Sequence, residues 1–441
     1  MLAGGIAGCT TAPGAAERAA RDHVAAIGER LRPVHAAALR PTLRSDSSRE
    51  EFVRFAVVTH PAVAAAYYDW RASVEAIAPT RALPDPQFTF EADIADTLMT
   101  FMPGFMFDLM GPGKRVAMTH EATAKSGVAY RNYVTMVLRT AVAVQKAWVE
   151  LAFSEDTRRL YQSAIENLDQ SVAVASAEYT TGRGMVSLEQ MVRLRNQAAE
   201  HHAHHATFGD RLAATRARFK SALGLSPADA DPAWPSPTLV ATTLPPEDEL
   251  WRLAQATNPE LAAMRAMVDM AVAEIAVAQK AGTPELMVGA MADLKADPLM
   301  VRPAAIVKLP IWREKIAANI AAARSRRDAA AARIDAEQLN LAAELAQMLY
   351  MVRDADRMIE YIDRIALPNV EQAVATAAAG YQSGMGLPAM IPESRHMAIT
   401  MRLERVKMLR ERELAAAELA GLIAGTAPVG APLLADAGGA R

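Results

Sequence analysis

Histidine is the residue type in this sequence with the clearest capacity to bind a metal ion. Four of the nine histidines lie in the run HHAHH at positions 201–205. His201 and His205 are four residues apart, so a helix would place both on one face, a spacing that can hold a divalent metal ion. The nearest acid is Glu200, and no cysteine is near. A solvated helix surface is therefore the simpler interpretation, and we expect no cofactor.

Methionine is the second residue type that could act as a ligand, with 23 copies in the chain. Met99, Met102, Met106 and Met110 lie close together in sequence, and thioether sulfurs suit Cu(I) or Ag(I). Methionine also fills irregular gaps in packed interiors, which explains the same cluster without a metal. The sequence contains no nucleotide-binding loop, no His-Glu-x-x-His motif and no nucleophile with a base nearby. We therefore expect no catalysis.

The single cysteine, Cys9, follows Ile6-Ala7-Gly8, and this context resembles a bacterial lipobox. In a lipoprotein the signal segment is removed, and this cysteine becomes the lipid-modified first residue. Only eight residues precede it and none is basic, so an unmodified cysteine is the alternative. One cysteine cannot form an internal disulfide. We expect lipid attachment at Cys9, with residues 1–9 as the remnant of a signal and lipobox.

The composition favours long helices over a compact globular core. Hydrophobic residues make up 51% of the chain, but much of this share is alanine and aromatic residues contribute only 5%. Alanine, arginine, glutamate and methionine are good helix formers. The net charge is -3 at pH 7 with both signs mixed, so no nucleic-acid partner is expected. No run of eighteen apolar residues occurs, so no transmembrane helix is expected.

Two stretches in each half alternate between apolar and polar residues, which is typical of half-buried strands. In the first half they begin at Pro84 and Gly104, and in the second half at Thr283 and Ala304. Four strands are too few to close a barrel. Their apolar faces would therefore stay exposed unless strands from other chains complete the sheet.

A long helix free of proline is predicted directly after each second strand. The first runs from Lys114 to about Glu178, and the second runs from Trp312 to about Leu367. Apolar residues in the second run follow a coiled-coil seam over more than four heptads. A helix of about 60 residues is roughly 90 Å long. Short glycine-bearing turns follow, and return helices are predicted over residues 188–223 and 390–423.

The order of predicted elements is the same in both halves, which indicates an internal duplication. His60 and Asn258 each precede a proline that opens a helix, and Tyr179 and Tyr381 each begin a Tyr-x-x-Gly-x-Gly turn. The predicted segments are an extended N-terminal stretch (10–50), a first repeat (51–224), a linker (225–249), a second repeat (250–424) and a disordered tail (425–441).

Over residues 52–423, this order resembles that of the TolC-type outer-membrane efflux channels of Gram-negative bacteria. The resemblance implies an α+β membrane protein in which three chains pool four strands each into a trimeric twelve-stranded β-barrel. A long α-helical coiled-coil barrel would continue it into the periplasm. The implied function is a passive exit duct in the outer membrane, with a lipid anchor. The implied partners are a periplasmic adaptor (membrane fusion) protein and an inner-membrane RND pump.

Two strand-to-helix joints resemble one branch of this family, the outer-membrane components of heavy-metal efflux systems of the copper, silver and zinc type. They are FDLMGPGKR at 107–115 and KLPIWREKIAANI at 308–320. Metal ions are therefore a candidate cargo, and drugs or other small molecules are the alternative. The competing function is a non-transporting coiled-coil scaffold, cytoplasmic if the N-terminus is native as written, but a scaffold has no use for four alternating strands.

The resemblance also implies that the two glycine-bearing turns form tips that meet the adaptor hairpin. The predicted docking residues are Gly182, Gly184, Met185, Val186, Ser187, Gly384, Gly386, Leu387 and Pro388. We expect their small apolar side chains to be uncovered. No aspartate follows Gly184 or Gly386, which departs from the commoner family form. Glu189 and Glu393 are the nearest acids and the candidates for a periplasmic constriction.

Overall fold

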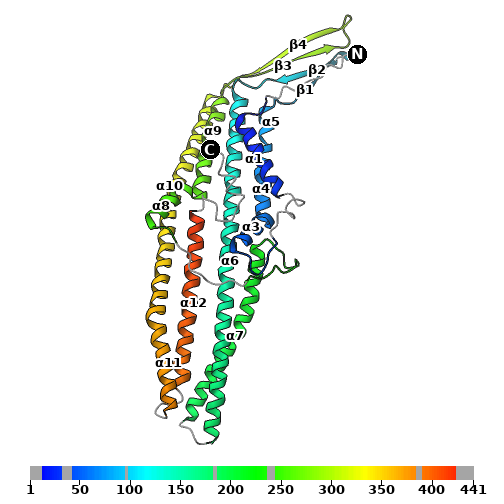
Figure 1. Cartoon of the computed structure of the whole chain (residues 1–441). Coiled ribbons are helices and arrows are strands. Elements are labelled where there is room, and N and C mark those ends of the chain that lie inside the picture. The colour runs from blue at the N-terminus through cyan, green and yellow to red at the C-terminus, as the bar shows by residue number, and fades with distance from the viewer. Residues whose placement is uncertain are drawn as a thin grey trace. The chain divides into compact units, whose positions relative to one another are not determined.

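The computed structural model describes residues 12–31, 42–94, 98–181, 186–235, 244–383 and 390–423. Within these residues the chain is mostly helical and carries one small sheet (Figure 1). Two compact units are present, and each takes segments from both halves of the sequence. The sheet unit comprises residues 1–35, 64–136 and 259–339, and the hairpin unit comprises residues 36–63, 137–258 and 340–441.

The two halves of the chain repeat one order of elements. The first half has helices α1 (Ala15–Leu31), α3 (Arg49–Thr59), α4 (Pro61–Glu75) and α5 (Ile77–Arg81), strands β1 (Gln87–Ile94) and β2 (Leu98–Asp108), and helices α6 (Lys114–Thr181) and α7 (Leu188–Ala222). The second half has helices α8 (Glu247–Thr257) and α9 (Pro259–Lys280), strands β3 (Glu285–Asp293) and β4 (Met300–Lys308), helix α10 (Arg313–Tyr361), π-helix η1 (Ile362–Ala366), and helices α11 (Leu367–Gln382) and α12 (Met390–Leu422). The four strands, both long helices and both return helices predicted from the sequence are therefore present.

The four strands form an open antiparallel sheet in the order β1-β2-β3-β4. Strand β2 begins at Leu98 and β4 begins at Met300, so both are longer at their N-terminal ends than the sequence predicted. Proline explains the difference, since Pro103 and Pro303 lie inside these strands and proline cannot donate to a ladder. Pro303 is tolerated on the edge strand β4, and Pro103 lies where the pairing of β2 with β3 ends.

One face of the sheet is aromatic and aliphatic, and the other carries polar side chains interspersed with methionines. Phe88, Phe90, Phe105 and Phe107 share the apolar face and are 45–64% exposed. The register places Phe88 opposite Phe105, and their rings meet edge to face with centroids 5.4 Å apart. Single exposed apolar side chains are common, but a contiguous aromatic patch on a surface marks a site that something else covers.

The methionine cluster predicted from the sequence does not form one group of ligands. Met102 and Met106 are 2% and 3% exposed and pack against the sheet. Met110 lies beyond the end of β2 with a positive φ of 46°. The side chain of Met99 lies outside the described part of the structure. Met102 and Met106 are therefore explained by their role in filling gaps in the packed interior, without a metal ion.

The two strand-to-helix joints meet at one carboxylate in the sheet unit. Gly113 adopts a φ of 73°, a conformation that glycine reaches without strain, and α6 begins at the next residue, Lys114. The ammonium group of Lys114 pairs with Glu285 Oε1, and Lys308 Nζ lies 3.2 Å from Glu285 Oε2. Glu285 therefore ties the start of α6 to the end of β4, although these elements come from different halves of the chain.

The second long helix does not end at Leu367, where the proline-free run ends. It passes through η1 into α11, so the helical run continues to Gln382. Pro368 would disrupt an ordinary α-helix, because its ring clashes with the preceding turn. The Leu367 N–H instead donates to Ile362 O, five residues back, and this wider π-turn accommodates the proline. Of the seam residues in this run, Leu341, Leu345, Val352, Ala355, Ile362 and Ala366 are buried, and Ile334, Met348 and Ile359 are half-buried.

The N-terminal stretch 10–50 is not extended throughout, because α1 occupies Ala15–Leu31. Strong helix formers fill this segment, and no proline interrupts it. Helix α1 packs on α4 in the sheet unit. Tyr67 O–H donates a hydrogen bond of 3.0 Å to Val24 O, and Arg21 pairs with Glu75 at 2.7 Å.

Each unit has an aromatic core of its own. In the sheet unit, the buried rings of Trp70 and Tyr133 stack with centroids 5.7 Å apart. In the hairpin unit, Phe52 contacts Trp148 and Phe219 with centroid distances of 5.3 and 5.4 Å. Aromatic side chains are scarce in this sequence, and these cores concentrate several of them where helices from both ends of a half converge.

Candidate functional site

The ends of two helical hairpins in the hairpin unit form the candidate site. Helices α6 and α7 run side by side as the first hairpin, and α11 and α12 form the second (Figure 1). Ser187 caps the return helix α7. Its Oγ accepts a hydrogen bond of 3.2 Å from the Gln190 N–H, and Gln190 Oε1 accepts one of 2.9 Å from the Ser187 N–H. This reciprocal capping box fixes the start of α7.

Most of the predicted docking residues lie outside the described residues. These are Gly182, Gly184, Met185, Gly384, Gly386, Leu387 and Pro388, and Cys9 is outside them as well. Val186 and Ser187 are described, so the site is built from them and from the helix ends that they adjoin.

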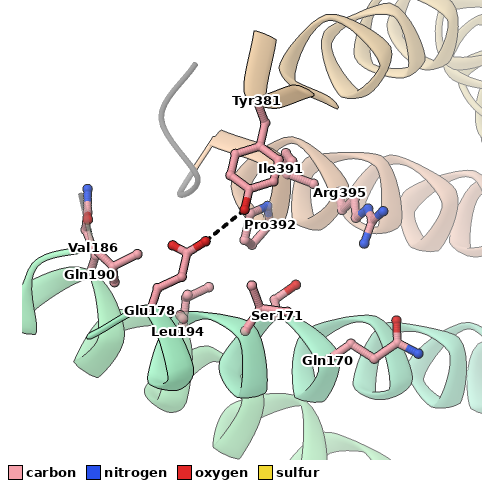
Figure 2. A pocket seen from close by; sticks show the side chains of 12 residues that line it. Gln170, Ser171, Glu178, Val186, Gln190, Leu194, Tyr381, Ile391, Pro392 and Arg395 are labelled. Carbon is pink, nitrogen blue, oxygen red and sulfur yellow. Dashed lines mark hydrogen bonds between the residues drawn. The ribbon is translucent and has the colours of Figure 1, made fainter. Parts of the chain in front are cut away.

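A groove lies between the ends of the two hairpins (Figure 2). Its lining comes from all four helices and from Val186, and it combines apolar side chains with a few polar ones. The lining residues are Gln170, Ser171, Val174, Ala175, Glu178, Val186, Gln190, Leu194, Tyr381, Ile391, Pro392 and Arg395. We call this surface the tip groove. An apolar floor with charged side chains at its margin is typical of a surface that receives an amphipathic segment.

One hydrogen bond crosses the tip groove and joins the two hairpins. Tyr381 O–H at the end of α11 donates to Glu178 Oε1 near the end of α6, at 2.8 Å (Figure 2). This bond to the carboxylate raises the pKa of the Tyr381 hydroxyl, so the tyrosine stays protonated and donating at neutral pH. In the sequence, Tyr381 stood out only as part of a repeated turn motif, and Glu178 was not among the predicted site residues. The two repeats nevertheless differ here: Glu178 precedes Tyr179 in the first repeat, and Gly380 precedes Tyr381 in the second, so only the first repeat carries a carboxylate at this position.

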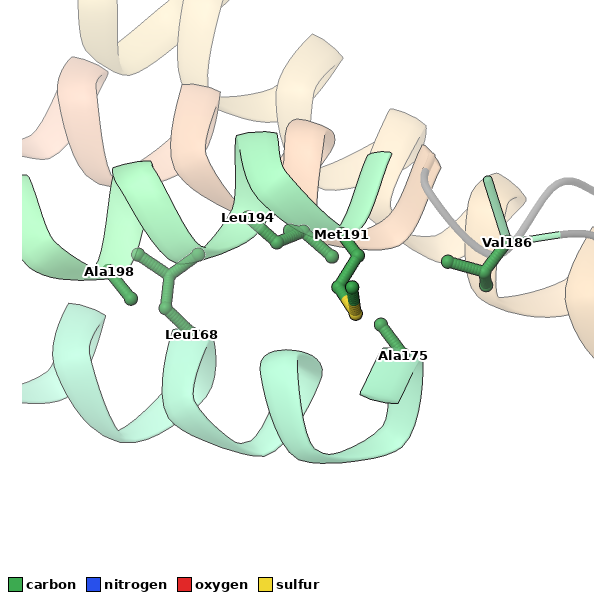
Figure 3. Packing of buried hydrophobic residues seen from close by; sticks show 6 residues of the cluster. All are labelled: Leu168, Ala175, Val186, Met191, Leu194 and Ala198. Carbon is green, nitrogen blue, oxygen red and sulfur yellow. The ribbon is translucent and has the colours of Figure 1, made fainter. Parts of the chain in front are cut away.

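Val186 is buried rather than uncovered, which corrects the prediction from sequence. It is 8% exposed and belongs to a cluster of buried residues inside the first hairpin (Figure 3). The other members of this cluster are Leu168, Ala175, Met191, Leu194 and Ala198. Val186 therefore helps to hold α6 against α7 and contributes only a small exposed part of its side chain to the lining of the tip groove.

Large apolar side chains are exposed on both hairpins near the tip groove. They come from α6, α7 and α12, and each is 46–55% exposed: Val174, Tyr179, Leu188, Val192, Met390 and Met397. Such a concentration at one end of a helical unit indicates a surface for another protein.

The two acids proposed for a constriction lie outside the groove lining. Glu189 forms an ion pair with Arg193 one turn later in α7, at 2.7 Å, and its side chain is exposed. Glu393 is exposed in the first turn of α12. Both positions are solvent-accessible near the hairpin ends, and their role in a constriction stays a prediction.

His201 and His205 do not form a pair on a solvated helix face. His201 is 5% exposed, and its Nε2 lies 3.1 Å from Nδ1 of His396 on α12. The exposed histidines of the run are His202, whose Nε2 lies 3.3 Å from the Asp169 carboxylate, and His204. The sequence alone could not place α12 against this face of α7. Among the described residues, no group of three or more histidine, cysteine or acidic side chains could hold a metal ion.

None of the helices in the described ranges combines the length and the apolar character needed to cross a bilayer.

Comparison with known proteins gives a family for part of the chain and a fold for most of it. Residues 250–425 match the family described as outer membrane efflux protein. The outer membrane protein VceC from Vibrio cholerae aligns with a TM-score of 0.70 and 15% identity, over 85% of this chain and 95% of that chain. The open state of the MtrE outer membrane channel of Neisseria gonorrhoeae aligns with a TM-score of 0.73 and 15% identity, over 88% and 91%.

A further solved structure, CusC, aligns with a TM-score of 0.70 and 15% identity, over 87% of this chain and 93% of that chain. At this level of identity the three likenesses show the fold. No curated protein sequence matches the chain.

Proposed function

Because residues 250–425 match the outer membrane efflux protein family and the chain has the fold of outer-membrane channels, we propose that this protein is the exit duct of a tripartite efflux pump. Its function is passive passage of substrate from the periplasm to the exterior, and it is not an enzyme. Three copies assemble into one duct in the outer membrane. A periplasmic adaptor and an inner-membrane RND pump are its partners.

The observation that carries this proposal is the open sheet with its aromatic face. Within the described residues, the outer edges of β1 and β4 have no partner strand. In water, free edges and exposed phenylalanines promote aggregation. A closed barrel in lipid removes both causes of aggregation. The free edges pair with strands of neighbouring copies, and the aromatic side chains face the hydrocarbon. Three chains of four strands make a twelve-stranded barrel, with the face that carries the polar side chains and methionines toward the lumen.

The joint after β4 fits a position near a membrane boundary. Leu309, Ile311 and Trp312 are all exposed between the end of β4 and the start of α10. Trp side chains are enriched at membrane interfaces, where one part of the ring is apolar and the N–H can reach water. Lys308 and Lys114 lie beside this joint. They support the same position near the membrane boundary, because long basic side chains place their charged ends in water or among lipid headgroups.

The tip groove is the proposed docking surface for the adaptor. It offers an apolar floor, charged margins at Glu178 and Arg395, and exposed apolar side chains on neighbouring turns. A helical hairpin from the adaptor could place an apolar stripe in such a groove, as helices do in other grooves. The turns at 182–185 and 384–389 adjoin the groove in sequence and complete the docking tips in this proposal, with Glu189 and Glu393 forming the periplasmic constriction.

Two finer parts of the proposal concern the anchor and the cargo. Cys9 carries the lipid, which holds each copy to the outer membrane beside its barrel strands. Metal ions are the cargo class to test first, because the joints at 107–115 and 308–320 resemble those of heavy-metal efflux systems. Met102 and Met106 would not bind that cargo, since both are buried against the sheet. Comparing export of Ag(I) and of a drug by one strain would distinguish the cargo classes.

Fractionation and assembly test the main proposal. The full-length protein expressed in a Gram-negative cell should be recovered in the outer-membrane fraction, as a trimer that survives mild detergent without heating. Expression together with a cognate adaptor and pump should restore export in a strain that lacks its own exit duct. Recovery of a soluble monomer from the cytosol would contradict the duct and would support the scaffold.

A further inference from the structure

A buried and a half-buried histidine join the hairpins at a second point, outside the lining of the tip groove. His201 of α7 and His396 of α12 are 195 positions apart in sequence, and their ring nitrogens Nε2 and Nδ1 lie 3.1 Å apart. The rings meet edge to face, with centroids 5.2 Å apart. A hydrogen bond between two imidazoles needs one N–H and one lone pair, so at least one of the rings must be neutral. The contact therefore depends on protonation.

The surroundings of His201 disfavour its charged form. Burial is the main cause that lowers the pKa of His201, and the charges of His396 and His204 act in the same direction, whereas Glu200 opposes them. The side of the ring that faces α6 meets Tyr161, with centroids 5.6 Å apart. Tyr161 of α6, Glu200 and His204 of α7, and His396 of α12 are the titratable groups that contact the ring or act on its pKa. Only Glu200 among them would stabilise an imidazolium.

The second nitrogen of His201 adds to this effect. Nδ1 is buried, and it has no hydrogen-bond partner in the described parts of the chain. A doubly protonated ring would carry an N–H donor at this nitrogen, and a buried donor without an acceptor is costly. Two nitrogens without a third ligand make an incomplete metal site, so proton binding is the better account of this pair.

We propose that His201 and His396 form a pH-sensitive latch between the α6–α7 and α11–α12 hairpins. When both rings are neutral, or when only one of them is protonated to imidazolium, one ring nitrogen donates a hydrogen bond to the other and the latch is closed. When both rings are imidazolium, two donors face each other across 3.1 Å and the like charges repel. Acidification then loosens α12 from α7.

The direction of the pH effect follows from linkage. An unperturbed histidine titrates near pH 6.5, and the folded state holds the pKa of His201 below this. The unfolded or opened state therefore binds more protons as pH falls, so the latch contributes fully above about pH 6.5 and is lost as pH falls through the folded-state pKa. Loosening is expected in acid and not in base.

Hydrogen–deuterium exchange of the full chain in detergent tests the latch at about pH 7.5 and about pH 5. After correction for the intrinsic rate, backbone amides in 198–206 and 392–400 should exchange about tenfold faster at the lower pH. The double variant His201→Gln, His396→Asn replaces both nitrogens by amide groups that can still hydrogen-bond but cannot titrate. Its exchange at these amides should not change with pH.

His202→Gln is the matched control, because His202 is exposed and contacts Asp169 rather than His396. This variant should keep the pH response of the wild type. If the double variant does not fold, the single variant His201→Gln carries the same expectation, since it removes the buried ring whose pKa is lowered. An unchanged pH response in these variants, or its loss in His202→Gln, would overturn the latch. The readout does not involve efflux, so it is independent of whether the protein is an exit duct.

Discussion

Met106 in β2 lies over Gly289 in β3, where its sulfur occupies the space that a side chain at Gly289 would need. A Cβ on Gly289 would stand 2.5 Å from Met106 Sδ and 2.0 Å from the carbonyl oxygen of Phe105. Gly104 and Met291 have the same relation, with 2.3 Å between a Cβ on Gly104 and Met291 Cγ. The strands that join the two halves of the chain thus approach closely because each glycine receives a methionine from the other half.

Replacing Gly289 by alanine should disrupt this junction. The new methyl group would meet backbone, which cannot move aside as a flexible side chain can, so overpacking should cost about 1–3 kcal/mol. Less folded, unheated trimer should survive in a urea series. Gly127→Ala in α6 is the control, because a Cβ there meets nothing within 4 Å and alanine favours a helix. Equal urea midpoints for the two variants would contradict the close approach.

The strands and helices were predictable because their patterns are local. Alternation with period two and runs without proline depend on neighbours in sequence, and all four strands and both return helices follow from them. The errors occurred at proline and in the N-terminal stretch. Pro103 and Pro303 are accepted where a ladder ends or on an edge strand, and Pro368 is accepted by a π-turn. Each depends on hydrogen-bond geometry that a sequence window does not contain.

The candidate site was less predictable, because it depends on which helices pack together. Val186 was expected to be uncovered but packs inside its hairpin, and His201 was expected to be solvated but meets His396. The bond from Tyr381 to Glu178 joins residues 203 positions apart, and only the tyrosine carried a motif. Val186 is buried by contacts within its own repeat, whereas His201 and Tyr381 meet residues of the other repeat, and a sequence window reveals neither kind of packing.

Arginine on the aromatic face of the sheet should reduce assembly of the proposed barrel. Phe105 lies in the exposed aromatic face, and Arg at the midplane of a barrel wall costs about 2–4 kcal/mol. We expect Phe105→Arg to reduce the amount of trimer in the outer membrane severalfold. Gln87→Arg adds the same charge on the opposite face, next to Met106 in register, and should assemble normally. If the two variants assembled equally well, the aromatic face would not face lipid.

Breaking a buried ion pair should strongly destabilise the hairpin unit. Arg412 is buried in α12, with Asp356 Oδ1 at 2.6 Å and the buried Glu413 Oε1 at 2.7 Å. Arg412→Met removes the positive charge beside Glu413, and loss of one member of such a buried pair costs about 3 kcal/mol. Chemical denaturation followed by the circular dichroism of the helices would measure it.

The matched control for Arg412 is an exposed arginine in α10. Arg357 pairs with Asp354 at 3.6 Å on the surface, and removal of such a pair changes stability by less than about 1 kcal/mol. Arg357→Met should therefore unfold close to the wild type. A loss for Arg412→Met no larger than this control would show that burial does not strengthen the pair.

Tyr381→Phe should loosen the two hairpins at the tip groove. The substitution removes only the hydroxyl that donates to Glu178 Oε1 at 2.8 Å. We expect larger single-channel conductance in a planar bilayer, and the wild type should approach the variant above about pH 10 as the tyrosine ionises. The sign follows from the raised pKa of Tyr381: the contact is present at lower pH and is lost as pH rises.

Tyr179→Phe provides the control for this experiment, because Tyr179 holds the corresponding position of the first repeat and is exposed. Its conductance should match the wild type. Equal conductance for Tyr381→Phe and the wild type would show that the hydrogen bond does not restrict the hairpins.

A positive charge in the tip groove should block the adaptor without harming the duct. Val174 lines the groove and is among the exposed apolar residues, so Val174→Arg should change stability by no more than about 0.5 kcal/mol. It should nevertheless weaken adaptor binding, because a long charged side chain replaces an apolar contact of the groove and must be desolvated under an apolar partner, even with Glu178 four residues later in α6. Pull-down of the purified trimer with the cognate adaptor and export in the reconstituted strain would both be measured.

Thr207→Arg adds the same charge to an exposed position of α7 outside the groove lining and should bind and export normally. If Val174→Arg assembled, bound the adaptor and exported as well as Thr207→Arg does, the adaptor would dock elsewhere, and the tip groove would lose its proposed role.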